Sequence, residues 1–283
     1  MPIIIDGKAT SAKIKAGLRE KCEAAKQQYG RVPGLAVIIV GEDPASKTYV
    51  KNKGIACEAC GFYSQTYALP EQTTMEQLLE LIDTLNNTDT IDGILVQLPL
   101  PRHLDAQKVI AAIRTDKDVD CFSYDNVGRV TTGAPRYLPC TPAGVMALLE
   151  EYHIDPCGKE CVVLGRSNIV GKPMALLLLA ANGTVTVCHS KTADLAATCR
   201  RADILVSAIG RAKMITADMV KDGAVVIDVG MNRDENGKLC GDVDYDAVAP
   251  KASAITPVPG GVGPMTIAML MQNTYTSFCE RVQ

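Results

Sequence analysis

Residues 159–173 read KECVVLGRSNIVGKP, and this stretch decides the class of fold. A short apolar run ends at Gly165, and after Gly171 a helix is predicted from Pro173. A glycine at the end of a buried strand permits a tight turn and lets a pyrophosphate group approach the N-terminus of the next helix. Ser167 stands where the usual G-x-G-x-x-G pattern has its second glycine, so an ordinary strand–turn–helix corner remains an alternative.

Similar apolar runs recur along the chain, separated by segments with helical periodicity. Strands that are apolar on both faces are typical of a parallel sheet covered by helices. The regular alternation of strand and helix predicts the α/β class. The runs are Leu35–Val40, Ile91–Val96, Cys161–Leu164, Val185–Cys188, Ile204–Ala208 and Val225–Val229.

The chain divides into two domains near residue 140. The segment Val127–Pro139 is rich in Gly, Thr and Pro, as a linker or surface loop is, and Thr141 and Pro142 then favour the start of a helix. We therefore predict an α/β fold with two domains, residues 1–139 and residues 140–265, and a cleft between them. The second is a Rossmann-like domain with a parallel sheet, and a C-terminal helix at about residues 266–283 is expected to pack back on the first.

The composition argues against several classes of protein. The chain has 283 residues and a net charge of −3, whereas a nucleic-acid-binding protein needs a basic stripe. No apolar stretch approaches the roughly 18 residues of a membrane span, and the N-terminus lacks the apolar core of a signal peptide. The 11 cysteines are odd in number and scattered. We therefore expect free thiols in a cytoplasmic protein without a metal site, a membrane partner or a nucleic-acid partner.

The segment after the second predicted strand of this domain is rich in hydrogen-bond donors. Thr184–Cys188 is followed by His189, Ser190 and Lys191, whereas NAD-binding domains usually carry an acidic residue here for the ribose hydroxyl. Arg166 and Ser190 are suited instead to a 2′-phosphate. The pattern predicts NADP as the cofactor, and the alternative is that these are ordinary solvated loop residues.

Small residues also follow the later strands of the second domain. Ser207–Gly210 and Asp228–Gly230 each end a buried run, where a dinucleotide can lie over the edge of an open sheet. The Gly- and Pro-rich segment Thr256–Thr266 comes directly before a helix and permits close approach of its backbone. We expect these segments to contact ligands, with simple connecting loops as the alternative.

Polar side chains in the first domain form a second candidate site. Ser46, Tyr49 and Lys53 are spaced to share one face of a helix, and a partly buried lysine can act as a general base or acid. Gln97 ends a buried strand, and Asp120 lies in a short acidic turn where a carboxylate can hold an amino-heterocycle. A solvated helix face and a structural turn are the alternatives.

Six motifs follow one another along the chain: Ser46-x-x-Tyr49-x-x-x-Lys53, Gln97–Pro101, Lys117–Asp120, Pro139–Pro142, Gly165–Gly171 and Pro257–Thr266. In this combination the whole chain resembles the bifunctional methylenetetrahydrofolate dehydrogenase/methenyltetrahydrofolate cyclohydrolase family. The resemblance implies NADP-dependent oxidation of methylenetetrahydrofolate to the methenyl form, then hydrolysis to formyltetrahydrofolate. It also implies a homodimer formed through the cofactor domain.

The resemblance implies roles for individual residues. Lys53 is the general base and acid of the hydrolysis, Tyr49 stacks on or orients the folate, and Gln97 binds the lysine and modulates its pKa. Asp120 anchors the pterin. The further substrate contacts implied are Leu98, Gly261, Gly263 and Pro264, and the cofactor contacts are Gly165, Arg166, Ser167, Ser190, Ile209, Gly210 and Thr256.

One position departs from the family pattern, and two other functions stay open. Cys121 stands where the family usually has glycine, and if that position needs a positive φ, a cysteine costs roughly 1 kcal/mol and alters the aim of Asp120. Another two-domain NADP dehydrogenase, acting on a shikimate-like acid, would explain Gly165–Gly171 but not Tyr49, Lys53 and Gln97. A non-catalytic NADP- or folate-binding regulator is the second alternative.

Overall fold

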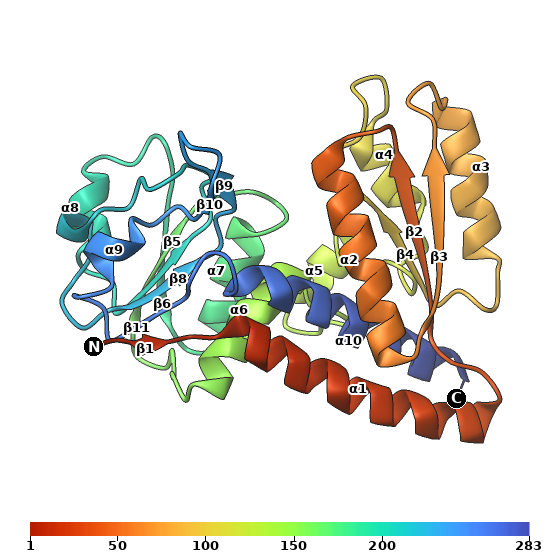
Figure 1. Cartoon of the computed structure of the whole chain (residues 1–283), viewed down its shortest axis with the longest axis horizontal. Helices are drawn as coiled ribbons and strands as arrows, with labels where there is room; N and C mark the ends of the chain where they lie inside the picture. The colour runs from red at the N-terminus through yellow and green to blue at the C-terminus, as the bar shows by residue number, and fades with distance from the viewer. Residues whose placement is uncertain (283) are drawn as a thin grey trace. The chain divides into compact units, whose positions relative to one another are not determined.

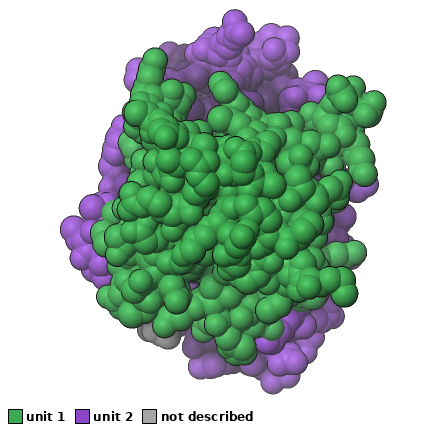
Figure 2. Space-filling view, turned by 90° about the vertical axis from the view of Figure 1, so that its left-hand side faces the viewer, with its two compact units in different colours: residues 1–11, 139–266 green, residues 12–138, 267–283 purple. Residues whose placement is uncertain are grey.

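The computed structural model describes residues 1–282, which fall into two compact units (Figure 2). Unit 1 consists of residues 1–11 and 139–266, and unit 2 of residues 12–138 together with the chain from residue 267 onward. The N-terminal residues thus belong to the same unit as the second predicted domain, unlike the prediction that residues 1–139 form one domain. The cause is a short strand, since Ile3 and Ile4 pair with Ala254 and Ile255.

The sheet of unit 1 is parallel throughout, as its runs of Val and Ile predict (Figure 1). Its inner strands are almost completely buried because helices and loops cover both faces, whereas the edge strands, residues 3–4 and 184–188, are partly exposed. In spatial order the strands are β1 (Ile3–Ile4), β11 (Ala254–Ile255), β8 (Val225–Asp228), β7 (Ile204–Ser207), β5 (Glu160–Leu164) and β6 (Thr184–Cys188).

The order of strands in unit 1 reverses at β5. The chain passes from β5 to β6 on one side and then returns to β7 on the other side of β5. Loops after β5 and β7 therefore separate in opposite directions, and open α/β sheets bind ligands in the crevice at such a point. The remaining elements of this unit are α6 (Cys140–Glu151), α7 (Gly171–Ala180), α8 (Leu195–Cys199), the 3₁₀ helix η1 (Ala217–Met219), the hairpin β9 (Asn232–Arg233) and β10 (Leu239–Cys240), and α9 (Tyr245–Val248).

The sheet of unit 2 has three parallel strands and also reverses its order. Strand β2 (Gly34–Val40) lies between β3 (Tyr63–Leu69) and β4 (Gly93–Val96). Its seven residues are all buried, and on one side the apolar face of α3 (Met75–Asn86) covers the sheet. The other helices are α1 (Gly7–Tyr29), α2 (Pro44–Cys60), α4 (Ala106–Ala112), α5 (Tyr124–Thr131) and α10 (Val262–Val282).

Helix boundaries match the sequence signals in most places and differ in four. Helix α6 begins at Cys140 rather than at Pro142, and α7 begins at Gly171 rather than at Pro173. The capping box at Thr74 and Gln77 is present with both of its hydrogen bonds. The helix α10 begins at Val262 rather than near residue 266, because Pro264 falls in its first turn, where no intrahelical N–H is needed. Part of the predicted linker is instead α5, which Ser123 caps.

Candidate active site

Helix α2 begins directly after β2 and places a lysine beside the end of β4. Asp43 caps the helix by accepting a hydrogen bond from the Ser46 N–H at 2.7 Å, and Pro44 is its first residue. Two turns later, Lys53 Nζ donates to Gln97 Oε1 at 2.8 Å. Gln97 is the first residue after β4, so the predicted meeting of helix and strand end occurs.

The Gln97 amide is fixed at both of its polar atoms. Its Oε1 accepts from Lys53, and its Nε2 donates to the Leu98 carbonyl at 2.7 Å. Flipping the amide would place its NH₂ group against the lysine amine and its oxygen against the Leu98 carbonyl. Only the observed orientation therefore allows both hydrogen bonds. A cis Leu98–Pro99 bond follows and turns the chain away from the sheet.

Tyr49 lies one turn before Lys53 on α2 and is 36% exposed. Partial burial raises the pKa of Tyr49 above its ordinary value, so the phenol stays protonated at neutral pH. The side chain therefore offers an aromatic face and a hydroxyl to a ligand at the same helix surface as the lysine. Ser46, the third predicted member of this stripe, is buried.

The turn that carries Asp120 is held by two buried charged residues. Lys117 is fully buried and donates to the Leu85 and Thr88 carbonyls at 2.9 and 2.8 Å. Asp118 accepts hydrogen bonds from the N–H of Ser123 at 2.8 Å and from the side chain of Asn126 at 2.9 Å. These roles were not foreseen, although both residues belong to the quoted motif.

Cys121 adopts the left-handed conformation, with a φ of 63°, that the family's glycine at this position would tolerate without strain. Its buried thiol donates to the Tyr137 carbonyl at 3.3 Å. Burial strongly raises the pKa of Cys121, and the neighbouring carboxylates of Asp118 and Asp120 add to the effect. The thiol is therefore a protonated, packed group, and Asp120 beside it is half-buried.

In unit 1 the turn after β5 is shaped to admit a pyrophosphate. Gly165 has a φ of 116°, and a Cβ there would overlap the Ala208 carbonyl oxygen. Likewise, a Cβ on Gly171 would overlap the Gly165 carbonyl. Ser167, at the place of the second glycine, accepts hydrogen bonds from the N–H groups of Val170 and Gly171 at 3.2 and 3.3 Å. This cradle fits the phosphates of a dinucleotide such as NADP.

The predicted readers of the 2′-phosphate follow adjacent strands. Leu164 of β5 pairs with Cys188 of β6, and Arg166 and Ser190 each come two residues after this pair. Both side chains are exposed, as is Lys191. The edge is therefore rich in donors where an NAD site carries a carboxylate.

The remaining predicted contacts in unit 1 range from buried to exposed. Thr256 is 1% exposed, and its hydroxyl accepts a hydrogen bond from the Asp228 N–H at 2.7 Å. Gly261 is also buried, and a Cβ there would approach the Pro257 carbonyl to 2.6 Å. Ile209, Gly263 and Pro264 are half-buried, and Gly210 is exposed. Thr256 and Gly261 therefore contact neighbouring backbone atoms, and these contacts fix the shape of the segment 256–261.

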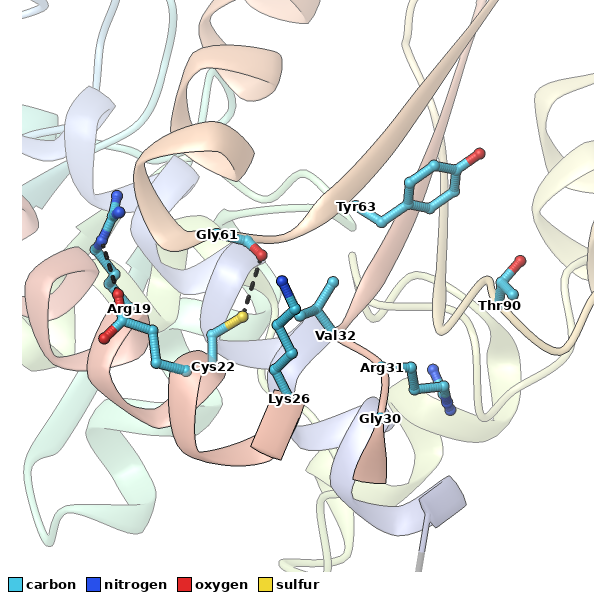
Figure 3. A pocket seen from close by; sticks show the side chains of 10 residues that line it. Arg19, Cys22, Lys26, Gly30, Arg31, Val32, Gly61, Tyr63 and Thr90 are labelled. Atoms are coloured by element: carbon cyan, nitrogen blue, oxygen red, sulfur yellow. Dashed lines mark hydrogen bonds and ion pairs between the residues drawn. The ribbon is translucent and has the colours of Figure 1, made fainter. Parts of the chain in front are cut away.

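Other features of the described residues lie away from these groups. A cavity of about 600 Å³ lies at the amino ends of the unit 2 strands, opposite Gln97, with Arg19, Cys22, Lys26 and Tyr63 among its lining (Figure 3). Within residues 1–282 no cluster of His, Cys, Asp and Glu could hold a metal, and all 11 cysteines are free thiols. No helix in this range is long and apolar enough to cross a membrane.

Comparisons with known proteins agree across the whole chain. The model of the tetrahydrofolate dehydrogenase/cyclohydrolase catalytic domain matches residues 5–120, and that of its NAD(P)-binding domain matches residues 139–282. The bifunctional protein FolD of Streptococcus pneumoniae is 60% identical over 275 residues, covering 97% of this chain and 96% of its own.

Solved structures of similar proteins have nearly the same fold. The bifunctional enzyme FolD of Campylobacter jejuni has a TM-score of 0.97 at 53% identity, covering 99% of this chain and 100% of its own. The Trypanosoma brucei enzyme, solved with NADP and an inhibitor, has a TM-score of 0.96 at 42% identity, with coverage of 100% and 99%. Motifs, fold and relatives thus agree, and the chain belongs to the tetrahydrofolate dehydrogenase/cyclohydrolase family.

Proposed function

We propose how this bifunctional enzyme, a methylenetetrahydrofolate dehydrogenase and methenyltetrahydrofolate cyclohydrolase, divides its two reactions between its residues. The hydrogen bond of 2.8 Å between Lys53 and Gln97 is the observation that carries the assignment. It places an amine, oriented by a fixed amide, at the carboxyl edge of a parallel sheet, where open α/β folds bind their ligands. The non-catalytic alternative does not explain this pair.

The dehydrogenase step depends on alignment. When bound, NADP supplies the acceptor for the hydride that leaves the methylene carbon of the folate. The residues of this chain contribute position: Gly165 and Ser167 shape the phosphate cradle, and Arg166 and Ser190 bind the 2′-phosphate. Hydride transfer requires no acid or base at the reacting carbon, so Lys53 transfers no proton in this step.

The hydrolysis depends on proton transfer by Lys53. Water adds to the methenyl carbon, the Lys53 amine takes the proton that the water loses, and a proton is given to the ring nitrogen as its bond to that carbon breaks. The products are formyltetrahydrofolate and one proton. The hydrogen bond that Lys53 donates to Gln97 holds the amine at the end of β4 for this proton transfer.

Binding of the folate derivative involves further residues. Tyr49 orients the ring system by stacking, Leu98 contacts the ligand, and the carboxylate of Asp120 accepts paired hydrogen bonds from the pterin. The resemblance to the family also implies substrate contacts from Gly261, Gly263 and Pro264 of unit 1. The half-burial of Asp120 supports its part, since a partly desolvated carboxylate binds an amino-heterocycle more strongly than an exposed one.

We further propose that the enzyme is a cytoplasmic homodimer assembled through unit 1. Its support is the resemblance to the family together with the absence, among residues 1–282, of a helix that could span a membrane. Light scattering on the purified protein is expected to give about twice the 30.2 kDa of one chain. A mass of one chain at micromolar concentration would contradict the dimer.

Replacing Lys53 with Met tests the assignment. Lys53→Met keeps the length of the side chain but removes the proton carrier, so we expect hydrolysis of methenyltetrahydrofolate to fall at least about 100-fold. The loss of methenyl absorbance, measured without NADP, reports this step alone.

Lys51→Met is the matched control, because Lys51 lies on the same helix with an exposed side chain. It should hydrolyse at the wild-type rate, and its melting temperature should match that of Lys53→Met. Hydrolysis at the wild-type rate by Lys53→Met would show that the amine is not the proton carrier.

A further inference from the structure

Two buried aspartates of unit 1, Asp228 and Asp242, have no part in the assignment above. Asp228 is the last residue of β8, and Asp242 follows the β9–β10 hairpin. Their exposed fractions are 3% and 0%. A buried carboxylate is costly unless hydrogen bonds satisfy it, so its partners show what it holds in place.

Asp242 accepts four hydrogen bonds around the loop that follows β7. Its Oδ2 accepts from the Ser207 hydroxyl at 3.1 Å and from the Ile209 N–H at 2.8 Å. Its Oδ1 accepts from the Arg211 N–H and from the Asn232 side chain, both at 2.9 Å. The carboxylate therefore holds the N–H groups on both sides of the exposed Gly210, one of the predicted cofactor contacts.

Asp228 holds the segment that carries Asp242. Its Oδ1 accepts from the N–H groups of Gly230 at 2.8 Å and Asp242 at 2.9 Å, and its Oδ2 accepts from the Val243 N–H at 2.8 Å. Burial raises the pKa of Asp228 to about 6, and these N–H groups oppose the rise. At neutral pH Asp228 is therefore mostly ionised and able to accept all three bonds.

Two glycines let these segments approach closely. A Cβ on Gly230 would overlap the Asp242 carboxyl group, and a Cβ on Gly241 would overlap that of Asp228. Each aspartate thus lies against a glycine of the other segment. We call Asp228, Gly230, Gly241 and Asp242 the aspartate clamp.

The loop held by the clamp lies against the turn that follows β5. The Ala208 carbonyl lies so close to Gly165 that a Cβ there would overlap it, and the Ala208 N–H donates to the Leu164 carbonyl at 2.8 Å. We propose that Asp242, supported by Asp228, is a positioning residue that fixes the Ile209–Arg211 loop in the shape that binds NADP. This proposal rests on the placement of NADP at this edge.

The variant Asp242→Asn tests the proposal. Whichever way the amide turns, its NH₂ group faces one of the two loop N–H groups, so one partly buried donor loses its acceptor. We expect the Kd for NADP, measured by calorimetric titration, and the KM for NADP to rise about tenfold, with kcat within about twofold. Hydrolysis of methenyltetrahydrofolate, assayed without NADP, should be unchanged. Hydrogen exchange at Ile209 and Arg211 should be faster.

Asp203→Asn is the matched control. Asp203 lies just before β7, and its Oδ2 accepts from the Glu160 N–H at 2.9 Å at the opposite end of the same sheet. This variant also deprives a backbone N–H of a carboxylate. It should bind NADP like the wild type even where it lowers the melting temperature, which separates the clamp from a general loosening of unit 1.

A second variant, Ser207→Ala, removes one donor from Asp242 and leaves no N–H unpaired, so the Kd for NADP should rise about two- to threefold. Should Asp242→Asn fail to fold, this variant decides. Wild-type affinity for NADP in Ser207→Ala, or in a folded Asp242→Asn, would overturn the proposal. An equal loss of dehydrogenase activity and of methenyltetrahydrofolate hydrolysis in Asp242→Asn would also overturn it. A wild-type protein that does not bind NADP would contradict the proposed cofactor site. In that case the rate of amide hydrogen exchange at Ile209, compared between the wild type and Asp242→Asn, would still test whether the clamp holds the loop.

Discussion

At the residue scale, we propose that the donor-rich edge after β5 and β6 decides which dinucleotide is used. Arg166 is exposed and follows Gly165, while Ser190 follows the neighbouring strand. A guanidinium group binds a phosphate through paired, charge-assisted hydrogen bonds, and the 2′-hydroxyl of NAD offers no such partner.

Arg166→Ala is therefore expected to raise the KM for NADP about tenfold while changing the KM for NAD less than about twofold. Steady-state rates of methenyltetrahydrofolate formation with each cofactor measure this ratio. Lys172→Ala, an exposed residue on α7, is the control and should leave the ratio unchanged. An equal rise for both cofactors would show that Arg166 does not read the 2′-phosphate.

At the scale of elements, the turn before Cys121 depends on a lysine that is buried among backbone carbonyls. Lys117 binds the Leu85 and Thr88 carbonyls at the C-terminal end of α3. Burial lowers the pKa of Lys117 from 10.5 to about 8, and Arg281 and Arg114 add to the effect, while Asp116 and Asp92 oppose it. The folded state therefore releases this proton at a lower pH than the unfolded chain does.

The consequence is a rise in stability with pH. Between about pH 8 and 10.5 the unfolded chain binds more protons at Lys117, so the free energy of unfolding should increase by on the order of 3 kcal/mol over this window. The free energy of unfolding is measured by urea unfolding as a function of pH for the wild type and for Lys117→Met. The difference between the two profiles reports Lys117 alone, because the cysteine thiols, which also titrate at high pH, contribute equally to both. Lys108→Met, which removes an exposed amine, should follow the wild-type profile. A flat difference for Lys117→Met would contradict the lowered pKa.

The sequence predicted elements best where one local signal sufficed. The capping box at Thr74 and the apolar strands are such cases, and both are present in the structure. Strand β3 escaped prediction because its alternating polar residues, YSQTYAL, belong to an edge strand with one solvated face. Strand β1 has two residues and exists because β11 pairs with it, which no local pattern reveals.

The candidate site residues could be predicted from separate motifs, whereas the hydrogen bonds that join residues far apart in the sequence could not. Helical spacing groups Tyr49 with Lys53, but the bond from Lys53 to Gln97 joins residues that are far apart in the sequence. Asp242 stands in an ordinary-looking turn after a glycine, and only the folded chain brings it to the loop at Ile209.

At the scale of the whole molecule, the chain passes between the two units at three places, and two of these lie inside helices. These two divisions fall between Ser11 and Ala12 within α1 and between Thr266 and Ile267 within α10, whereas the third, between Leu138 and Pro139, lies in a loop. Unfolding one unit therefore removes part of a helix that the other unit needs, and partial helices of this length are unstable alone. The two units should unfold together.

Calorimetry is expected to show one transition, which NADP shifts upward as a whole. At 100 times its Kd, a ligand of the folded state adds about 2.7 kcal/mol, or roughly 5 °C for a chain of this size. Arg166→Ala at the same NADP concentration should show a smaller shift. Two separate transitions, of which NADP moves only one, would refute the coupling.

The same division has a consequence for how the polypeptide matures during translation. Residues Ile3 and Ile4 are synthesised about 250 residues before their partners Ala254 and Ile255, and α10 completes unit 2 after that. Neither unit possesses all of its strands and helices until α10 has been synthesised. The nascent chain must therefore wait with apolar strands exposed, so its yield in a cell should depend on chaperones that bind unfinished chains.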